Sequence, residues 1–450
     1  MLEQMMENLF PTLFLTENKI KKLRIRISAY ALGVDTNYEC GEQLINELIS
    51  IYDAANLDYL FNFRGLIQSH QSKWREAEVS FKKAIILKPN NPVYLMNMVA
   101  LQNKRGHKQE AIDWYERAVS TSGYPHASQF FATHFFLNAN EYKRAWECVE
   151  SFEPSYVQTY KRQQQEAVVS DEVQIFVASI LDSVPLWRGE TLQEKNILLH
   201  SNPATDGLGD VILWLRFVSK VAALGANVIL AIPPSLRNLA AQLPVIIYTE
   251  ELTNLQLDYH SPVIFLPWRF DTQIDTIPTK PYLNPEKDLV TQWQQRFARF
   301  SGIKVGLVWR SADDDTRTIE PRNIAQLLSV SGVSFFSLQV HEKAASDLQV
   351  LKKQGEIIDV AADLTDFNQT AAAIAALDLM ITVDTSVANL CGAMGRSDWV
   401  MLGLYEDFRW PAWFPTIRLF NQLVYRRWKP VMDEVIEQLN IKVKGIIHES

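Results

Sequence analysis

The 450-residue sequence is poor in cysteine, and its three cysteines, Cys40, Cys148 and Cys391, lie far apart. An odd number at wide spacing argues against a disulfide framework, and no two of them have the close spacing of zinc ligands. We therefore expect a protein of the reducing cytoplasm, with no metal site built on cysteine.

Long apolar runs and an excess of basic residues are also missing. No window holds 18 uninterrupted apolar residues, so we expect no transmembrane segment. Glu3 and Glu7 occupy the place of a basic leader and Pro11 interrupts the apolar stretch, so a secretory signal peptide is not expected. A net charge of -8 gives no reason to expect a nucleic acid or an anionic membrane as partner.

What the first third does contain is a repeat. Three stretches, KWREAEVSFKKAI, KQEAIDWYERAV and YKRAWECVESF, align at a spacing of 34 residues through Ala77, Ala111 and Ala145. Gly65 precedes Ala77 by twelve residues and Pro89 follows it by twelve. This pattern resembles the tetratricopeptide repeat, in which a small residue allows close helix packing and a proline ends the second helix. Such arrays bind a peptide or a neighbouring domain on a concave surface, or only support the rest of the chain, and the sequence leaves both open.

After a polar stretch the periodicity changes. Short apolar runs alternate with amphipathic stretches, which predicts parallel sheets covered by helices on both faces. The predicted strands are Asn196–His200, Asn227–Ile232, Val263–Leu266, Lys304–Trp309, Val333–Leu338, Ile357–Asp359, Leu379–Val383 and Trp399–Leu402. We predict an α + α/β fold with four parts: helical repeats over 1–155, a helical linker over 156–195, and Rossmann-like halves over 196–284 and 285–450, with a C-terminal helix.

Ligands bind parallel sheets beyond the carboxyl ends of the strands. After the first strand comes GLGD, in which Gly207 and Gly209 allow a tight turn and a close backbone approach to a ligand. Asp210 then lies near a helix N-terminus, either as a functional carboxylate or as a helix cap.

The second half opens with a strand that delivers Arg310 to the same edge, with Arg317 on the loop that follows. Arginine side chains suit diphosphate oxygens, although pairing with the acidic run Asp313–Asp315 is an equal alternative. The next strand places Gln339 and His341 near this edge. A lone histidine is more often structural than catalytic.

The run LMITV ends at Asp384, Thr385 and Ser386, where a helix with small residues begins. A helix N-terminus offers free N–H groups and a positive dipole, which favours a phosphate site, although Thr385 or Ser386 capping the helix explains them equally well. Capping does not require Asp384, a carboxylate that would repel phosphate unless it binds sugar hydroxyls. The aromatic segment around Trp410 and Trp413 is interpreted mainly as a hydrophobic cover.

The order of these motifs, GLGDVI, GLVW, SLQ, DFxxTAAxIAALDL, VDTSVA and WPxWFP, resembles bacterial tetratricopeptide proteins with a glycosyltransferase-like domain. They are similar to glycosyltransferase family nine, the heptosyltransferases, and more distantly to O-linked N-acetylglucosamine transferases. The resemblance implies a GT-B architecture, no metal or cofactor, and a nucleotide-sugar donor held mainly by the second half. It implies a general base at Asp210, a contact from Asp384 to the donor sugar, and Thr385 and Ser386 near the phosphates.

Two departures from that family pattern matter. Asn389 stands where relatives carry histidine, and the loop after GLVW is acidic instead of containing Gly-Asn. The leading hypothesis is a metal-independent glycosyltransferase that moves a sugar to a glycan or protein hydroxyl, with Arg310, Arg317, Gln339 and Asn389 on the donor side. The alternative is a non-catalytic interaction protein whose repeats bind a partner. A nucleotide-sugar epimerase shares the fold.

Overall fold

The computed structural model divides the chain into two compact units, Met1–Ser128 and Gln129–Ser450. Within them the structure describes residues 37–51, 57–121, 126–166, 172–202, 206–249, 252, 255–311, 317–340, 343–404, 407–424 and 427–449. Of the residues singled out in the sequence, Glu3, Glu7, Pro11, Asp313–Asp315 and His341 lie outside these ranges.

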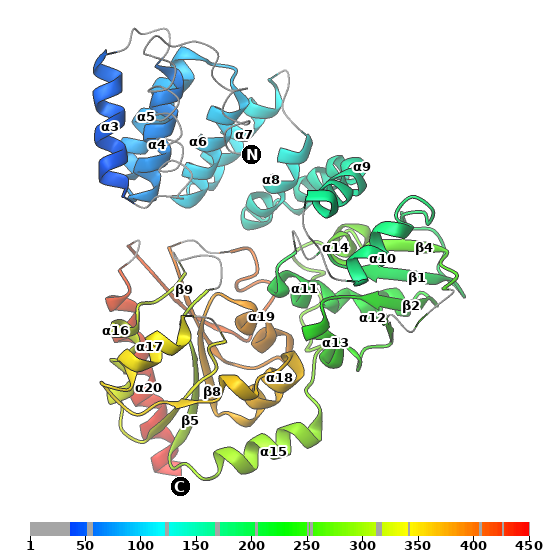
Figure 1. Ribbon diagram of the computed structural model, residues 1–450, viewed down its shortest axis with the longest axis vertical. Helices are drawn as coiled ribbons and strands as arrows, with labels where there is room; N and C mark the ends of the chain where they lie inside the picture. The colour runs from blue at the N-terminus through cyan, green and yellow to red at the C-terminus, as the bar shows by residue number, and fades with distance from the viewer. Residues whose placement is uncertain are drawn as a thin grey trace. The chain divides into compact units, whose positions relative to one another are not determined.

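The first unit consists of helices that pack in chain order (Figure 1). They are α3 (Tyr38–Ile51), α4 (Asp58–His70), α5 (Trp74–Leu87), α6 (Pro92–Lys104) and α7 (Lys108–Val119). Two of the repeat positions, Ala77 in α5 and Ala111 in α7, are fully buried. A Cβ at Gly65 would lie 2.6 Å from the Phe81 ring, so α4 and α5 approach as closely as the small-residue pattern predicts. The helical N-terminal region is confirmed, and its assignment to the tetratricopeptide class stays a prediction.

The second unit begins within α8 (His126–Asn138), which is followed by α9 (Tyr142–Glu166) and α10 (Glu172–Ile180). The third repeat copy lies in α9, which runs on without interruption into the predicted linker. Trp146 in α9 donates its indole N–H to the carbonyl of Thr272 (2.7 Å), and Glu153 pairs with Arg269 (2.9 Å). These contacts attach α9 to the first α/β half.

That half is built on a four-stranded parallel sheet in the order β3-β2-β1-β4. Its strands are β1 (Asn196–His200), β2 (Asn227–Ala231), β3 (Ile246–Ile247) and β4 (Tyr259–Pro262). Its helical segments are α11 (Leu208–Trp214), η2 (Leu215–Phe217), α12 (Val218–Ala222), α13 (Pro234–Ala240), η3 (Val263–Phe265) and α14 (Leu266–Arg269).

The other half has a six-stranded parallel sheet in the order β10-β9-β8-β5-β6-β7. Its strands are β5 (Ile303–Val308), β6 (Val333–Ser337), β7 (Ile358–Asp359), β8 (Leu379–Val383), β9 (Trp399–Leu402) and β10 (Arg418–Asn421). Its helical segments are α15 (Lys287–Phe297), α16 (Pro321–Ile324), η4 (Leu327–Ser329), α17 (Ala344–Leu351), η5 (Ala361–Asp363), α18 (Phe367–Ala376), α19 (Ser386–Ala393) and α20 (Lys429–Glu449). The predicted fold class, helices followed by two parallel α/β halves, is confirmed.

One predicted strand is wrong. The run Val263–Leu266 forms the 3₁₀ turn η3 and the start of α14, and the strand is the preceding segment β4. Pro267 at the start of α14 fixes a backbone angle that favours a helix there, and it has no N–H to give to a sheet. The short strands β3 and β10 were not predicted.

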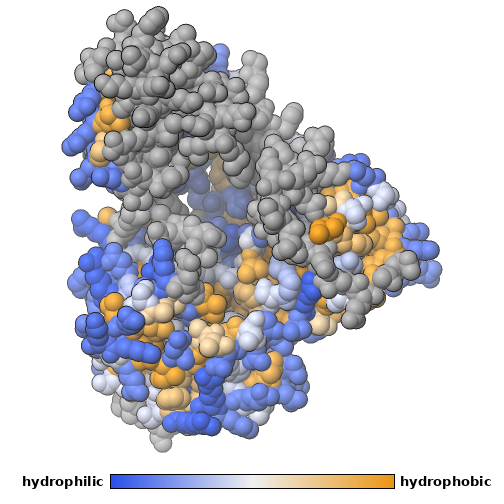
Figure 2. Space-filling model, viewed as in Figure 1, coloured by the Kyte–Doolittle hydropathy of each residue, from blue (hydrophilic) through white to orange (hydrophobic). Residues whose placement is uncertain are grey.

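Both α/β halves expose hydrophobic and hydrophilic residues side by side (Figure 2). Among the described residues, large exposed apolar side chains include those of Ile274, Val340 and Leu423. No helix in the described part of the chain is long and apolar enough to cross a membrane.

Candidate functional site

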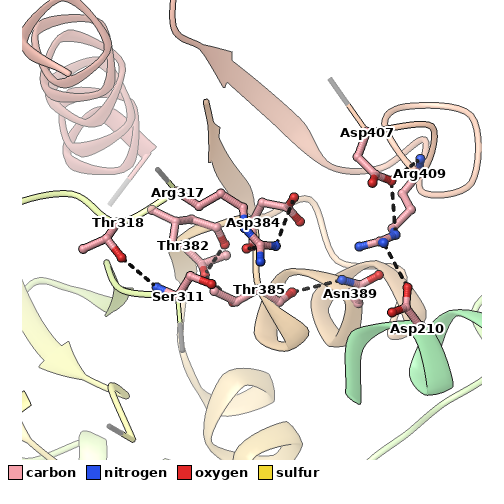
Figure 3. Close-up of polar contacts among 11 residues, drawn as sticks. Asp210, Ser311, Arg317, Thr318, Thr382, Asp384, Thr385, Asn389, Asp407 and Arg409 are labelled. Carbon is pink, nitrogen blue, oxygen red and sulfur yellow. Dashed lines mark hydrogen bonds and ion pairs between the residues drawn. The ribbon is translucent and has the colours of Figure 1, made fainter. Parts of the chain in front are cut away.

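The candidate site lies where α11 of the first half meets α19 of the second. Both helices begin just after the carboxyl end of a strand, β1 and β8, and they pack against each other. A Cβ at Gly209 would lie 2.9 Å from Nδ2 of Asn389, so the contact depends on a residue without a side chain. The polar residues predicted from the two halves therefore gather in one place (Figure 3).

Gly207 and Gly209 serve this packing. Gly207 precedes α11 with an ordinary extended backbone, φ -62° and ψ 151°, and a Cβ there would come within 3.2 Å of the Asp210 carboxylate. In the described structure, the close approach of Gly209 is to Asn389 and to the backbone of Ser386.

Asp210 is in the first turn of α11, but it does not cap the helix, because the N-cap position is Gly207. Its Oδ1 accepts a hydrogen bond from Nη2 of Arg409 at 2.9 Å (Figure 3). Arg409 also pairs through Nε with Asp407 at 3.1 Å. A salt bridge thus joins the candidate base of the first half to the segment between β9 and β10 of the second.

Asp384 directly follows β8 and is 8% exposed. Arg317 donates to the backbone carbonyl of Asp384 (3.2 Å) and lies 3.7 Å from Oδ2 of the same residue. The other carboxylate oxygen of Asp384, Oδ1, has no hydrogen-bond partner. Burial raises the pKa of Asp384. Asp407 adds to this rise, and Arg409, Arg317 and the side chain of Trp410 oppose it. A buried carboxylate with an unsatisfied oxygen is suited to accept hydrogen bonds from hydroxyl groups.

Thr385 occupies the N-cap of α19, but its side chain makes no capping hydrogen bond. Its hydroxyl lies 3.3 Å from that of Thr382 instead. The neighbouring helix α18 is capped in the usual way, since Asp366 accepts from the N–H of Gln369 at 2.8 Å. The side-chain cap that a purely structural explanation requires is therefore found at α18 and not at α19.

The start of α19 opens on a pocket of about 330 Å³. The pocket has an apolar wall that includes Leu338 and Leu364, and a polar lining that includes Asp366, Thr370, Thr385 and Ser386. Pockets of roughly this size, mostly apolar with a few polar groups, are typical of small-molecule sites. A helix N-terminus at one end makes this pocket suitable for an anionic ligand.

Arg310 and Gln339 also line this pocket, but both side chains are engaged by the protein. Arg310 pairs with Asp347 through Nε (2.9 Å) and Nη2 (2.8 Å). The Gln339 side-chain oxygen accepts from the N–H groups of Trp309 (3.0 Å) and Arg310 (2.8 Å). These contacts continue the β5–β6 pairing beyond the strand ends and fix the shape of the pocket wall.

Arg317 is held near Asp384 by the way its loop returns to the sheet. The N–H of Ile319 donates to the carbonyl of Trp309 (2.8 Å), and Thr318 accepts from the N–H of Ser311 (3.2 Å). About a third of the Arg317 side chain stays exposed. Of the two arginines predicted from the sequence, Arg317 is the more accessible.

Asn389 is 1% exposed and donates from Nδ2 to the carbonyl of Thr385 at 3.0 Å. Its side chain packs under the first turn of α19 and against Gly209, so it supports the helix start from inside. In this conformation the side chain cannot contact a ligand in the pocket, and the donor-binding role expected for it stays a prediction.

A second, smaller pocket of about 70 Å³ lies beside Asp210. Its lining is mainly apolar and aromatic, from Trp146 in α9, Trp214 in α11, and Phe408, and it also includes Thr133 in α8. Leu208 lines the larger pocket and Asp210 the smaller one, so the GLGD turn lies between the two.

Sequence reasoning missed Arg409, Asp407 and Asp347. The segment of Arg409 was noticed for its aromatic residues, and Trp410, Trp413 and Phe414 are indeed buried. The arginine within that aromatic run is the signal that was available. Among the described residues, no cluster of three or more His, Cys, Asp or Glu side chains has the arrangement of a metal site.

The Arg310–Asp347 pair provides a first prediction. Replacing Asp347 by asparagine removes the charge opposite a mostly buried guanidinium and weakens the acceptor for the Trp309 indole N–H. We expect the free energy of unfolding to fall by about 2 kcal/mol, measured by urea titration. The matched control is Asp363→Asn, which removes an exposed partner of Arg296 and should change stability by less than about 1 kcal/mol. Equal losses in the two variants would contradict a structural role for the Asp347 pair.

The chain was compared with protein-family models, with known protein sequences and with solved structures. No protein-family model matches the chain. It is 24% identical over 430 residues, 84% of this chain, to Protein FlbA of Caulobacter vibrioides, and it spans 66% of that protein's length.

Similar solved structures include a glycosyl transferase family 9 protein from Veillonella parvula, with 13% identity and a TM-score of 0.46 over 59% of this chain and 100% of the other. The structure of E. coli ADP-heptose lps heptosyltransferase II has 13% sequence identity and a TM-score of 0.44, over 57% of this chain and 100% of the other. A Thermobaculum terrenum O-GlcNAc transferase mutant has 11% sequence identity and a TM-score of 0.27, over 97% of this chain and 94% of the other. At these values the likenesses carry no functional assignment, which has to rest on the residues of the site.

Proposed function

We propose that this chain is a metal-independent glycosyltransferase that moves a sugar from a nucleotide-sugar donor to a hydroxyl group of a glycan or protein. The observation that carries the proposal is the pairing of two elements across the α11–α19 contact. One is a pocket at the uncapped start of α19, and the other is a partly exposed carboxylate, Asp210, at the start of α11. The order of motifs along the sequence supports the same activity.

In this proposal the donor diphosphate binds at the start of α19. The first N–H groups of the helix, the Thr385 and Ser386 hydroxyls and the Arg317 guanidinium stabilise the charge that develops on the leaving group. The unsatisfied oxygen of Asp384 accepts hydrogen bonds from the sugar hydroxyls. The nucleoside lies along the apolar wall that includes Leu338 and Leu364.

Asp210 acts as the general base in this proposal. It lines the smaller pocket, where an acceptor hydroxyl that enters between α9 and α11 can reach the carboxylate. A carboxylate takes the hydroxyl proton as the oxygen attacks the anomeric carbon and the bond to the diphosphate breaks. The helical repeats of the first unit are proposed to bind the acceptor or a protein partner.

Nucleotide binding tests this proposal most directly. We expect UDP, GDP or ADP to raise the melting temperature in the presence of EDTA, because a ligand at 100 times its dissociation constant stabilises the folded state by about 2.7 kcal/mol. The variant Thr385→Val should weaken binding about tenfold, since it removes a hydroxyl donor to a charged group.

Thr370→Val is the matched control. Thr370 lines the same pocket, but its hydroxyl already donates to the carbonyl of Asp366 at 2.9 Å. The nucleotide affinity of the Thr370→Val variant should stay within about threefold of that of the wild type. No thermal shift with any nucleotide would contradict the proposal and favour an interaction protein with a glycosyltransferase-like fold. The engagement of Arg310 and Gln339 by the protein itself is the observation that favours this second candidate.

A further inference from the structure

Arg409 is the residue that connects the two halves of the candidate site. It belongs to the segment between β9 and β10, yet its guanidinium bonds to Asp210 in α11, 199 residues away in the chain. Its side chain is 11% exposed. The contact is therefore a largely buried charge pair across the junction of the two halves.

Three carboxylates surround this guanidinium. Asp210 and Asp407 contact it directly, and Asp384 interacts with it electrostatically. Burial lowers the pKa of Arg409, but these three carboxylates raise it more, so the pKa lies above its ordinary value. Arg317 is the other cation that acts on Asp384. Three negative charges thus interact with two positive ones, and one of the three, Asp384, directly precedes Thr385 in the chain.

Such a cluster is unfavourable for a diphosphate unless its carboxylates are neutralised. At an effective dielectric constant of about 20, two unit charges about 4 Å apart interact by about 4 kcal/mol, so one unpaired carboxylate matters for an anionic ligand. Arg409 does not line the larger pocket and is held by its own carboxylates. The charge of Arg409 therefore acts on the site only by neutralising these carboxylates, not by contacting a ligand in the larger pocket.

We propose that Arg409 is a positioning residue that orients Asp210 and serves as the counter-ion that allows an anionic donor to bind beside Asp384. The proposal rests on the proposed function, because it assumes that a nucleotide diphosphate binds at Thr385 and Ser386. It explains how a carboxylate and a phosphate site occupy adjacent positions at the end of β8.

Arg216 offers a matched control. It anchors the same segment by donating to the carbonyl of Trp413 (2.9 Å), and it lies over the rings of Trp413, Phe414 and Tyr282. Arg216 donates hydrogen bonds to backbone carbonyls and to the Tyr282 hydroxyl, not to a carboxylate. Removing Arg216 therefore disturbs the segment without removing the counter-ion of Asp384.

The experiment measures dissociation constants for UDP, GDP and ADP in EDTA at pH 6 and pH 8 by calorimetry, corrected for the folded fraction. We expect Arg409→Met to weaken binding about tenfold or more at pH 8 and clearly less at pH 6. Arg409 opposes the rise in the pKa of Asp384, so removing Arg409 raises that pKa further, and the carboxylate repels the phosphate less as the pH falls. Taking the ratio to wild type at each pH cancels ionisation of the nucleotide itself.

Three further variants complete the test. Arg409→Lys keeps the charge and should bind within about threefold of wild type, and the double variant R409M/D384N should regain binding at pH 8. Arg216→Met should change affinity by the same factor at both pH values. If R409M loses the same factor of nucleotide affinity at both pH values, or if the double variant does not regain affinity, this inference is overturned and the proposed function is not. Should R409M fail to fold, the double variant decides: recovery supports the counter-ion role, and failure to fold or bind overturns it. A wild type that binds none of the nucleotides overturns the proposed function together with this inference.

Discussion

Replacing Asp210 by asparagine is expected to slow sugar transfer by about 10²- to 10⁴-fold while nucleotide affinity changes little. The amide has nearly the same shape, but it cannot take a proton from the acceptor hydroxyl. It also leaves Arg409 with a weaker partner, so its melting temperature should be recorded alongside. The measurement is single-turnover transfer from a radiolabelled donor, with nucleotide binding by calorimetry as the second readout.

The matched control is Asp407→Asn. This variant also removes a carboxylate that contacts Arg409, but from the side away from α11. If Asp210 is the base, D407N retains most of its transfer activity and D210N loses it. Undiminished turnover in D210N would remove Asp210 from the mechanism, and equal losses in both variants would assign the effect to the charge cluster as a whole.

The second large effect concerns stability and pH. His200 in β1 and His260 in β4 are both buried at the end of the first sheet, with Nε2 of one 3.1 Å from Nδ1 of the other. Burial lowers the pKa of His260 to about 4, and burial together with the charge of His260 lowers the pKa of His200 well below its ordinary value. Both imidazoles are therefore neutral in the folded protein near neutral pH.

The direction of the pH effect follows from proton binding. Below pH 6.5 the unfolded chain protonates these histidines while the folded chain does not, so acid favours unfolding. For His260 alone, a pKa of about 4 against an ordinary value of 6.5 corresponds to about 3 kcal/mol lost between pH 6.5 and pH 4. Urea titrations at pH 7, 5.5 and 4.5 measure this loss.

A glutamine at position 260 separates the histidine contribution from that of other titrating groups. It can still hydrogen-bond to His200 but does not titrate, so the stability of H260Q should depend less on pH over this range. The exposed His107, which lies 3.4 Å from Glu110, supplies the control, and H107Q should follow the wild-type curve. Parallel curves for wild type and H260Q would contradict a buried neutral pair.

The sequence predicted those parts of the fold that depend on local pattern. The predicted bounds of β1, β8 and β9 coincide with the observed ones, because each is a nearly continuous apolar run. The strand β4 was missed because its sequence, YHSP, is polar. Its His260 is buried and lies against His200, 60 residues earlier, and local sequence does not contain that contact.

The residues of the candidate site also divide into those that local sequence predicts and those that depend on contacts between distant parts of the chain. Asp384, Thr385 and Asp210 were predicted because residues at strand ends and helix starts are recognisable from local pattern. Arg409 was not, since its relation to Asp210 exists only after the two halves pack. Arg310 was expected to face diphosphate oxygens or, equally, to pair with the acidic run, but its observed partner is Asp347, which lies in α17, 37 residues further along the chain.

The aromatic contacts of Trp413 also constrain when this protein can fold. Its ring lies 5.1 Å from that of Trp214 and 6.2 Å from that of Phe217, both in the first half, and 6.4 Å from that of Tyr142 in α9. On the ribosome, these early residues emerge about two hundred residues or more before their partner. Part of the aromatic core of the first α/β half therefore stays uncovered until Trp413 has been synthesised and has left the ribosome.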